Sequence, residues 1–84
     1  MSYGVFLQRS AQKALEKVPS EIRDRIYHAL RNLRDNPRPP GCKKLKNSGY
    51  WRIRIGDYRA IYEIEDAVQT VTVLRIAHRG EIYR

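Results

Sequence analysis

The sequence predicts an α+β domain: an N-terminal strand, two helices and then an antiparallel β meander, with both helices packed on one face of the sheet. Three observations lead to this class. Apolar residues recur at helical spacing in the first half, the segment NPRPPG at 36–41 interrupts the chain, and the second half alternates apolar and polar residues. A length of 84 residues predicts one domain, residues 1–84.

The first half contains one expected strand and two expected helices. Residues 3–8 alternate weakly and predict the strand, and the helix over 11–17 follows, with Ser10 as its expected cap. Pro19 ends this helix or opens the next, because a first-turn residue makes no use of its missing N–H. The second helix, 22–33, has an apolar face made of Ile22, Ile26, Leu30 and Leu33.

The second half contains the strands of the meander. Residues 42–46 are ambiguous and allow a short edge strand, whereas 50–55 alternate strictly. Gly56-Asp57 has glycine where a two-residue type II′ turn requires it, and 58–65 continue the hairpin. Residues 70–78 are mostly apolar, which predicts an interior strand buried on both faces.

Composition excludes several classes of protein. The single cysteine, Cys42, cannot form an internal disulfide, which fits a reducing cytosol and predicts a cytoplasmic protein. One cysteine and two distant histidines, His28 and His78, match no metal-ligand spacing, so we expect neither a metal nor another cofactor. No apolar run approaches a membrane span, and no signal peptide is expected.

Positive charge is the strongest property of the whole sequence. Seventeen Lys and Arg stand against nine Asp and Glu, for a formal net charge of +8 and an isoelectric point near 10.1. Residues 38–59 alone hold seven basic side chains and one acidic one. This local excess favours a polyanionic partner: nucleic acid, a membrane surface or an acidic protein.

The hairpin places its arginines away from its core residues. Trp51, Ile53 and Ile55 share one face. Arg52 and Arg54 therefore share the opposite face, and Arg59 follows just past the turn. Arginine forks bind phosphate oxygens in pairs of hydrogen bonds, so this face predicts a phosphate-binding groove.

The end of the chain can complete this groove. If strand 70–78 lies beside the hairpin, Arg79 and Tyr83 return to it, together with His78, and the rings can stack on unpaired bases. The alternative is a basic face that is only solvated. The same alternatives, solubilising charge or RNA binding, apply to Lys43, Lys44 and Lys46.

At these residues the sequence resembles the RelE family of toxins from bacterial and archaeal toxin–antitoxin pairs. The resemblance covers nearly the whole chain, through the segments KALEKVPSEIR, NPRPPG, KKLKNSGYWRIRIGDYRAIYEI and VTVLRIAHRGEIYR. The last two are the specific part: alternating basic and apolar residues, then GDYR before an apolar pair and tyrosine, then HR before a closing tyrosine. The fold it implies is the same α+β arrangement.

The resemblance implies a metal-independent endoribonuclease that cuts mRNA in the ribosomal A site. Family members activate a ribose 2′-OH against the adjacent phosphate, which leaves a 2′,3′-cyclic phosphate and a free 5′-OH. By position, Arg52 and Arg54 match the paired basic strand residues, and Arg59 matches the phosphate-binding arginine. Arg79 matches the arginine that stabilises the transition state or leaving group, and Tyr83 the tyrosine that stacks on a base and assists proton transfer.

One departure from the family pattern affects the choice of general base. The first two basic positions are often lysine in the family, but here they are Arg52 and Arg54. Arginine cannot lose its proton in proteins, so we assign both residues to electrostatic stabilisation and substrate positioning. The base is then His78, Tyr83 or a ribosomal group; His78 is also expected to contact RNA.

The resemblance also implies partners and leaves two alternatives. The expected partners are a RelB-like antitoxin that is at least partly acidic, the ribosome and mRNA, with no membrane. One alternative is a ParE-like toxin that binds a topoisomerase; Arg79 and Tyr83 favour RelE, because the ParE branch generally lacks this set. The other is an RNA or ribosome binder without catalysis.

Overall fold

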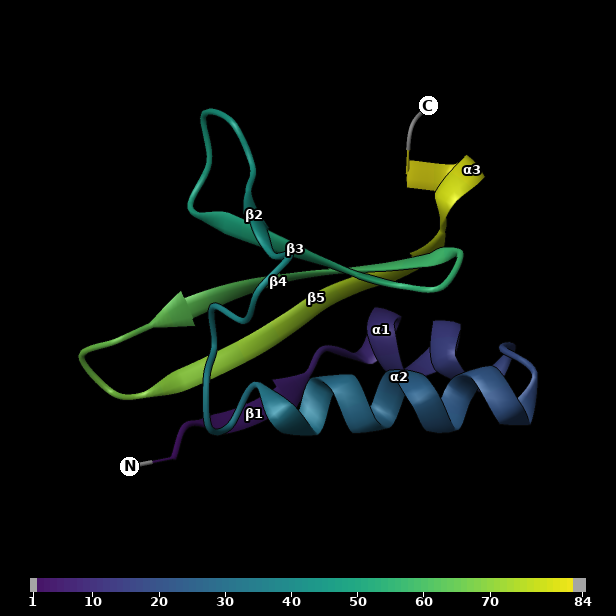
Figure 1. The fold of residues 1–84 in the computed structure, drawn as a ribbon, viewed down its shortest axis with the longest axis horizontal. Helices are drawn as coiled ribbons and strands as arrows, with labels where there is room; N and C mark the ends of the chain where they lie inside the picture. Colours follow the sequence, from purple (N-terminus) through teal and green to yellow (C-terminus); the bar gives the residue numbers. More distant parts are fainter. Residues whose placement is uncertain (1, 83–84) are drawn as a thin grey trace.

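A five-stranded sheet covered by two helices on one face makes up the fold (Figure 1). The computed structural model describes the backbone of residues 2–82 and the side chains of residues 2–80. The strands lie in the order β1-β5-β4-β3-β2. In chain order the elements are β1 (Gly4–Leu7), α1 (Arg9–Glu16), α2 (Ser20–Asn32), β2 (Lys43–Lys44), β3 (Tyr50–Ile55), β4 (Tyr58–Glu65), β5 (Thr70–His78) and α3 (Arg79–Ile82).

The predicted α+β fold is confirmed, including the antiparallel pairing of β3 with β4 and of β4 with β5. The bounds of these three strands coincide with those read from the sequence. Gly56 has a φ of +60° at the first position of the β3–β4 turn, the conformation that a type II′ turn requires. The ambiguous segment 42–46 contributes β2, a two-residue edge strand paired with β3.

The N-terminal strand pairs in a way that local sequence does not predict. β1 lies at the sheet edge and runs parallel to β5, with Gly4 opposite Thr70 and Leu7 opposite Val73. A parallel pair needs a crossover connection, and here α1, α2 and the two antiparallel hairpins supply it. The helices therefore fill the face of the sheet that this crossover covers.

The predicted cap of the first helix is wrong. Gln8, rather than Ser10, precedes α1, and Ser10 lies inside the helix. The backbone N–H of Gln8 bonds to the Val73 carbonyl at 2.9 Å, so the chain passes from β1 into α1 without a loop that Ser10 could cap. The Ser10 hydroxyl instead donates to the carbonyl of Leu74 at 3.1 Å. Pro19 directly precedes α2, which confirms that it opens the second helix.

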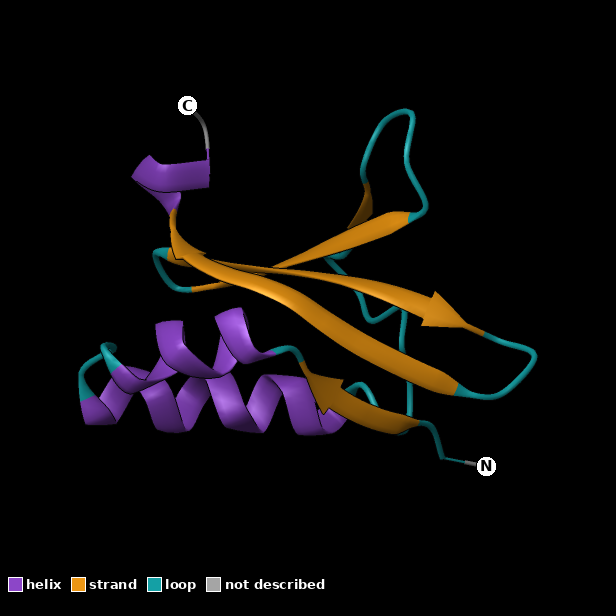
Figure 2. Ribbon diagram, turned by 180° about the vertical axis from the view of Figure 1, so that it is seen from behind, coloured by secondary structure: helices purple, strands orange, loops and turns teal. Residues whose placement is uncertain are grey.

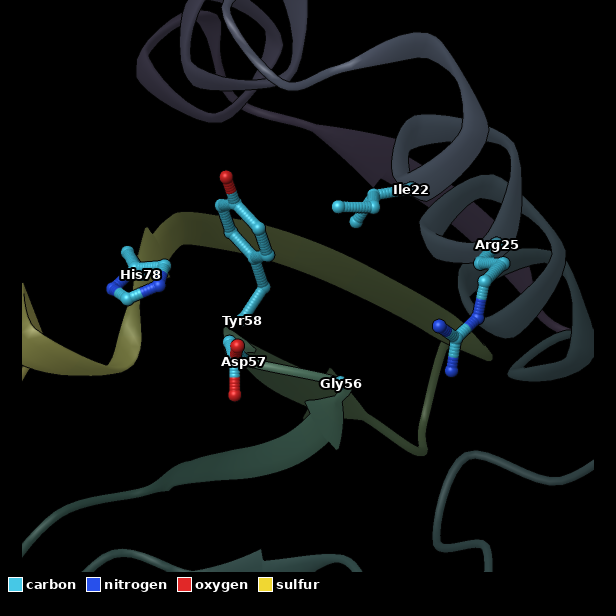
Figure 3. Close-up of a pocket in the computed structure, with 6 residues that line it drawn as sticks. All are labelled: Ile22, Arg25, Gly56, Asp57, Tyr58 and His78. Carbon is cyan, nitrogen blue, oxygen red and sulfur yellow. The ribbon is translucent and has the colours of Figure 1, made fainter.

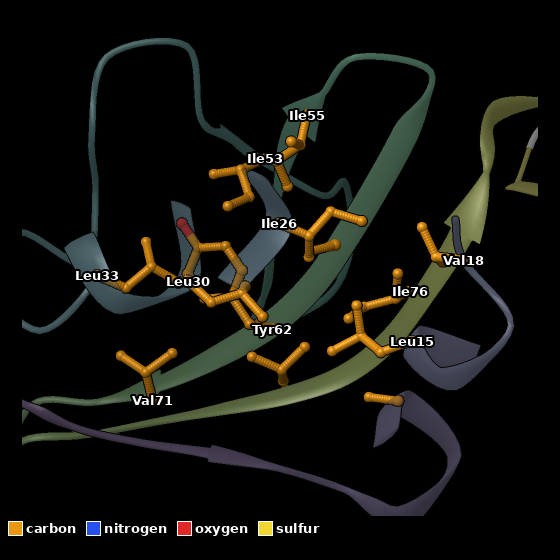
Figure 4. Packing of buried hydrophobic residues seen from close by; sticks show 13 residues of the cluster. Leu15, Val18, Ile26, Leu30, Leu33, Ile53, Ile55, Tyr62, Val71 and Ile76 are labelled. Atoms are coloured by element: carbon orange, nitrogen blue, oxygen red, sulfur yellow. The ribbon is translucent and has the colours of Figure 1, made fainter. Parts of the chain in front are cut away.

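The core lies between the helices and the sheet (Figure 4). Leu15 of α1 and Ile26 of α2 are fully buried, and they face Tyr62, Val71 and other buried strand residues. The Tyr62 hydroxyl donates to the Pro37 carbonyl at 2.8 Å, which satisfies a buried polar group. Burial without access to water raises the pKa of Tyr62.

β5 is an interior strand, as predicted, because β1 and β4 flank it. Its expected burial on both faces is wrong. Val71 and Val73 are fully buried, whereas Arg75 is exposed and Thr72 is only half-buried. The reason is that both long helices pack on one face of the sheet (Figure 2), so Thr72 and Arg75 on the other face keep contact with water, although Ala77 on that face is buried.

The proline-rich loop after α2 is held by Arg38. Its guanidinium bonds to the Asp66 carboxylate at 2.8 Å and lies 5.1 Å from the centre of the Trp51 ring. The Tyr3 hydroxyl donates to the same carboxylate at 2.7 Å. These two hydrogen bonds, Arg38 first, lower the pKa of Asp66. The loop, the β4–β5 turn and the N-terminus are thus joined at the end of the sheet opposite α3.

Candidate functional site

The side of the sheet away from α1 and α2 is the candidate functional surface, and we call it the open face. Its members follow from the pairing register, since directly paired strand residues point to the same side. The residues of the open face on β2 to β5 are Lys43, Tyr50, Arg52, Arg54, Arg59, Ile61, Glu63, Glu65, Thr70, Thr72, Arg75 and Ala77. The β2–β3 loop and α3 both project on this side (Figures 1 and 2).

Two rows of paired residues cross the open face. The Arg52 row consists of Lys43, Arg52, Ile61 and Arg75 on β2, β3, β4 and β5. The Arg54 row consists of Arg54, Arg59 and Ala77 on β3, β4 and β5. Neither row contains a carboxylate. Five cations therefore gather on adjacent strands near the end of the sheet that α3 follows.

Acidic side chains gather at the opposite end of the same face. Glu63 pairs with Tyr50 and with Thr72, and Glu65 pairs with Thr70. The open face is thus basic toward the β3–β4 turn and acidic toward the β4–β5 turn. A polyanion is attracted to the basic end and repelled from the acidic end, so it should bind nearer to the β3–β4 turn.

Arg54 and Arg59 lie directly opposite each other, yet their environments differ. Arg54 is exposed, and its Nε donates to the Gly56 carbonyl at 3.4 Å. Arg59 is only 4% exposed and lies where α3 packs against β4 and β5. Placing two like charges opposite each other is unfavourable, and full burial of arginine is rare. Of the two side chains, Arg54 is therefore the one that solvent reaches freely.

Only one of the three predicted lysines clearly joins this face. Lys43 pairs with Arg52 and points to the open face. Lys44 pairs with Trp51 and therefore points to the opposite side. Lys46 is exposed in the loop between β2 and β3, which projects on the side of the open face.

Arg79 is held at the edge of the open face by its backbone. Its N–H donates to the Asp57 carbonyl at 2.7 Å, which ties the start of α3 to the β3–β4 turn. The Arg79 side chain is exposed. Tyr83, the other predicted residue of this segment, lies outside the described residues.

The structure places His78 apart from the arginines. It pairs with Tyr58, which shares the helix-covered face with Ile55, and the two rings meet edge to face with centroids 5.3 Å apart. Figure 3 shows both rings at a hollow of about 260 Å³ between α2 and the β3–β4 turn. This hollow is lined by Ile22, Arg25, Gly56, Asp57, Tyr58 and His78.

Arg75 was missed by reading the sequence. Simple alternation along β5 places it with Val71 and Val73, on the side that packs against the helices. The register instead pairs Arg75 with Ile61 on the open face, because one residue, Leu74, is inserted between Val73 and Arg75. The signal that could have found it is the charge itself, since an unpaired arginine in a core position is costly.

Two further features of the described residues bear on what the site can do. Among the described side chains, residues 2–80, no group of three or more His, Cys, Asp and Glu is arranged to hold a metal ion. None of the described helices is both long and apolar enough to cross a membrane. The chemistry that the open face itself offers is charge: guanidinium groups that bind phosphate oxygens.

Comparison with known proteins places the chain in a family. The model of a family described as the ParE toxin of the type II toxin–antitoxin system ParDE matches residues 5–83. The toxin RelG of Mycobacterium tuberculosis is 36% identical over 87 residues, which cover 100% of this chain and 99% of RelG.

Solved structures agree with this assignment. The archaeal RelE–RelB complex from Pyrococcus horikoshii contains a chain that matches with a TM-score of 0.86 and 29% identity, over 95% of this chain and 98% of that one. The RelBE2 complex of Mycobacterium tuberculosis gives a TM-score of 0.84 and 30% identity, over 94% and 100%. This chain therefore belongs to the RelE family of toxins from type II toxin–antitoxin systems.

Proposed function

We propose that this toxin is a ribosome-dependent mRNA endonuclease, an mRNA interferase that cuts the message in the A site and so inhibits translation. The observation that carries the proposal is the convergence of Arg52, Arg54 and Arg59 on one open face, with Arg79 held at its edge. Several guanidiniums in two strand rows, which contain no carboxylate among the described residues, suit a phosphate that gains negative charge.

The reaction needs no nucleophile from the protein. The ribose 2′-oxygen attacks the adjacent phosphorus and loses its proton, and a pentacoordinate phosphorane forms. The bond from phosphorus to the 5′-oxygen of the next nucleotide then breaks, and that oxygen takes a proton. The products are a 2′,3′-cyclic phosphate and a 5′-OH. Arg54 and Arg59 stabilise the phosphorane, Arg52 positions the strand, and Arg79 stabilises the leaving group.

The proposal restricts the proton acceptor to two candidates. Arginine cannot serve, because it keeps its proton at any pH at which the protein is folded. His78 faces the helix side of the sheet, away from the arginine rows, which argues against it as the base. Tyr83, assigned by its match to the family pattern, and a group of the ribosome are the remaining candidates.

The proposed partners are an antitoxin, the ribosome and mRNA, in the cytoplasm. The structures named RelE–RelB contain an antitoxin bound to the related toxin, which supports a RelB-like partner for this chain. The strong positive charge of the chain favours a partner that is at least partly acidic. The ribosome would orient the message, so weak cleavage of free RNA is expected.

A ParE-like activity is the second candidate, because the matching family model carries that description. Such a toxin binds a topoisomerase and cuts no RNA. The arginine rows favour RNA cleavage over topoisomerase binding, since binding a protein does not require cations clustered at one end of an exposed sheet face.

The test is translation of a reporter mRNA in a purified system with added toxin, with 5′ ends mapped by primer extension. The same mRNA without ribosomes is the control. The proposal predicts cuts at A-site codons only when ribosomes are present, with 5′-OH ends. Stalled translation without cuts would favour a binder without catalysis, and unaffected translation would favour the topoisomerase target.

A further inference from the structure

The inserted residue in β5 changes which side of the sheet its second half presents. Tyr62 pairs with Val73 and Ile61 pairs with Arg75, so Leu74 is a β-bulge without a partner of its own on β4. Before the bulge, Val71 and Val73 are fully buried against the helices. After it, Ile76 takes the buried side and Arg75 points to the open face.

The bulge is held from the helix side. The Ser10 hydroxyl in α1 donates to the Leu74 carbonyl at 3.1 Å, and the backbone N–H of Gln8 donates to Val73 at 2.9 Å. Bulges are over-represented next to active sites, where they re-aim a side chain. Because hydrogen bonds hold both Val73 and Leu74, the bulge keeps the Arg75 side chain on the open face.

Arg75 extends the Arg52 row across the sheet. It lies two strands from Arg52, at about 10 Å by the spacing of neighbouring strands, with Ile61 between them. Its side chain is exposed, and among the described residues no carboxylate forms an ion pair with it. An apolar side chain between two guanidiniums suits a nucleotide whose base covers the apolar residue while its flanking phosphates meet the cations.

A solvated arginine on the surface is the simpler explanation, and the position argues against it. Arg75 shares its row with Lys43 and Arg52, whereas Glu63 lies one row and Glu65 two rows closer to the β4–β5 turn. Strand pairing without the bulge would place Arg75 in the core, so the fold keeps an arginine there only through a special backbone feature. In a regular strand without the bulge, this buried position would suit a leucine or a valine.

We propose that Arg75 is a positioning residue that binds a phosphate of the RNA strand next to the one that reacts. The strand would then cross β3, β4 and β5 along the Arg52 row, with a base on Ile61. This inference rests on the proposed function, in that it takes single-stranded RNA as the substrate. Arg75 would act on the substrate's position and affinity, not on the reacting atoms.

The test measures binding of a short single-stranded 2′-O-methyl RNA, which lacks the attacking hydroxyl and therefore stays intact. Fluorescence anisotropy gives the dissociation constant at several salt concentrations for the wild type, Arg75→Gln, Arg75→Lys and Arg31→Gln. Arg31 is exposed on α2, on the other side of the sheet, and is the matched control. Thermal unfolding checks that all four proteins fold alike.

The proposal predicts that Arg75→Gln weakens binding several-fold and lowers the slope of log K against log salt by about 0.7, the value for one phosphate contact on a single strand. Arg75→Lys should keep the slope, and Arg31→Gln should resemble the wild type. If Arg75→Gln binds as Arg31→Gln does, the proposal is overturned, even when the wild type cuts mRNA.

The translation assay on the same proteins separates this inference from the proposed function. If the wild type binds RNA, Arg75→Gln binds it more weakly, and the wild type cuts no message, Arg75 is an RNA contact and the proposed nuclease activity is wrong. A wild type with no affinity for RNA at any salt concentration would overturn the Arg75 contact; the proposed function would then be kept if that protein cuts the message on ribosomes and lost if it does not.

Discussion

The two faces of the sheet are built from the same strands but have opposite properties. On the helix side, Tyr62, Val71 and Val73 have no exposed surface. On the open face, Arg75 of β5 and Arg54 of the adjoining strand β3 are exposed to solvent. Strand alternation thus lets a chain of 84 residues use alternate residues for stability and for a charged surface.

Stability and activity should therefore respond to different residues. Substitutions on the helix side should change the free energy of unfolding, and substitutions on the open face should change RNA binding and cleavage.

Tyr62→Ala should cause the largest loss of stability, about 3–5 kcal/mol, because it removes a fully buried ring. A small domain has little more stability than this, so much of the protein would be unfolded. Urea denaturation followed by circular dichroism measures the change. Tyr62→Phe is the control: it keeps the ring and loses the bond to the Pro37 carbonyl, which should cost about 1 kcal/mol. Similar losses for both variants would contradict the packing shown in Figure 4.

Arg79→Ala should abolish most cleavage while leaving the fold intact. The side chain is exposed, and the bond from its backbone N–H to the Asp57 carbonyl remains in the variant. Loss of one group that stabilises charge in the transition state costs about 10²–10³ in rate. Quantitative primer extension in the translation system measures this, with Arg31→Gln as the control. A rate equal to that of the control would remove Arg79 from the site.

Ser10→Ala tests whether the two faces are coupled through the bulge. The hydroxyl bond to the Leu74 carbonyl should contribute about 1 kcal/mol, and its loss should loosen the bulge. We expect a modest decrease in unfolding free energy together with weaker RNA binding, since Arg75 would be held less firmly. Chemical denaturation and RNA anisotropy measure the two effects. Lower stability with unchanged RNA affinity would show that Ser10 serves the core alone.

Asp66→Asn should have the smallest effect, and it should depend on pH. The folded-state pKa of Asp66 is lowered, so its stabilisation is present above the unfolded value near 3.9 and is lost as the pH falls through the folded value. The variant should therefore unfold slightly earlier than the wild type at neutral pH and match it in strong acid. Melting temperatures across that range measure this, with the exposed Asp35→Asn as the control. A difference that persists unchanged in acid would exclude the carboxylate as its source.

Sequence patterns predicted the meander well, and they predicted only in part which side chains share the open face. Strict alternation in 50–55 and the glycine turn after it define β3, β4 and their faces through local chemistry alone. The parallel pairing of β1 with β5 joins residues far apart in the chain, which no local pattern encodes. The role of Ser10 was misjudged for the same reason, since its partner is Leu74.

The bulge explains the remaining differences at the site. Alternation assigns a face only while the register is unbroken, and one inserted residue reverses every assignment after it. Arg75 therefore lies on the open face, and not on the helix side that simple alternation predicts. His78 was grouped with the arginines by its place in the sequence beside Arg79, but its side chain points to the helix side.

The most direct test of the account asks whether the substrate supplies the nucleophile, as a site made of arginines requires. An mRNA with a single 2′-deoxynucleotide on the 5′ side of the mapped cleavage site would be translated with the wild-type toxin, beside the unmodified message. The account predicts that cutting at this bond is lost in the modified message and continues in the unmodified one. Cutting of both messages at the same bond would contradict it, because another group would then have to attack the phosphate.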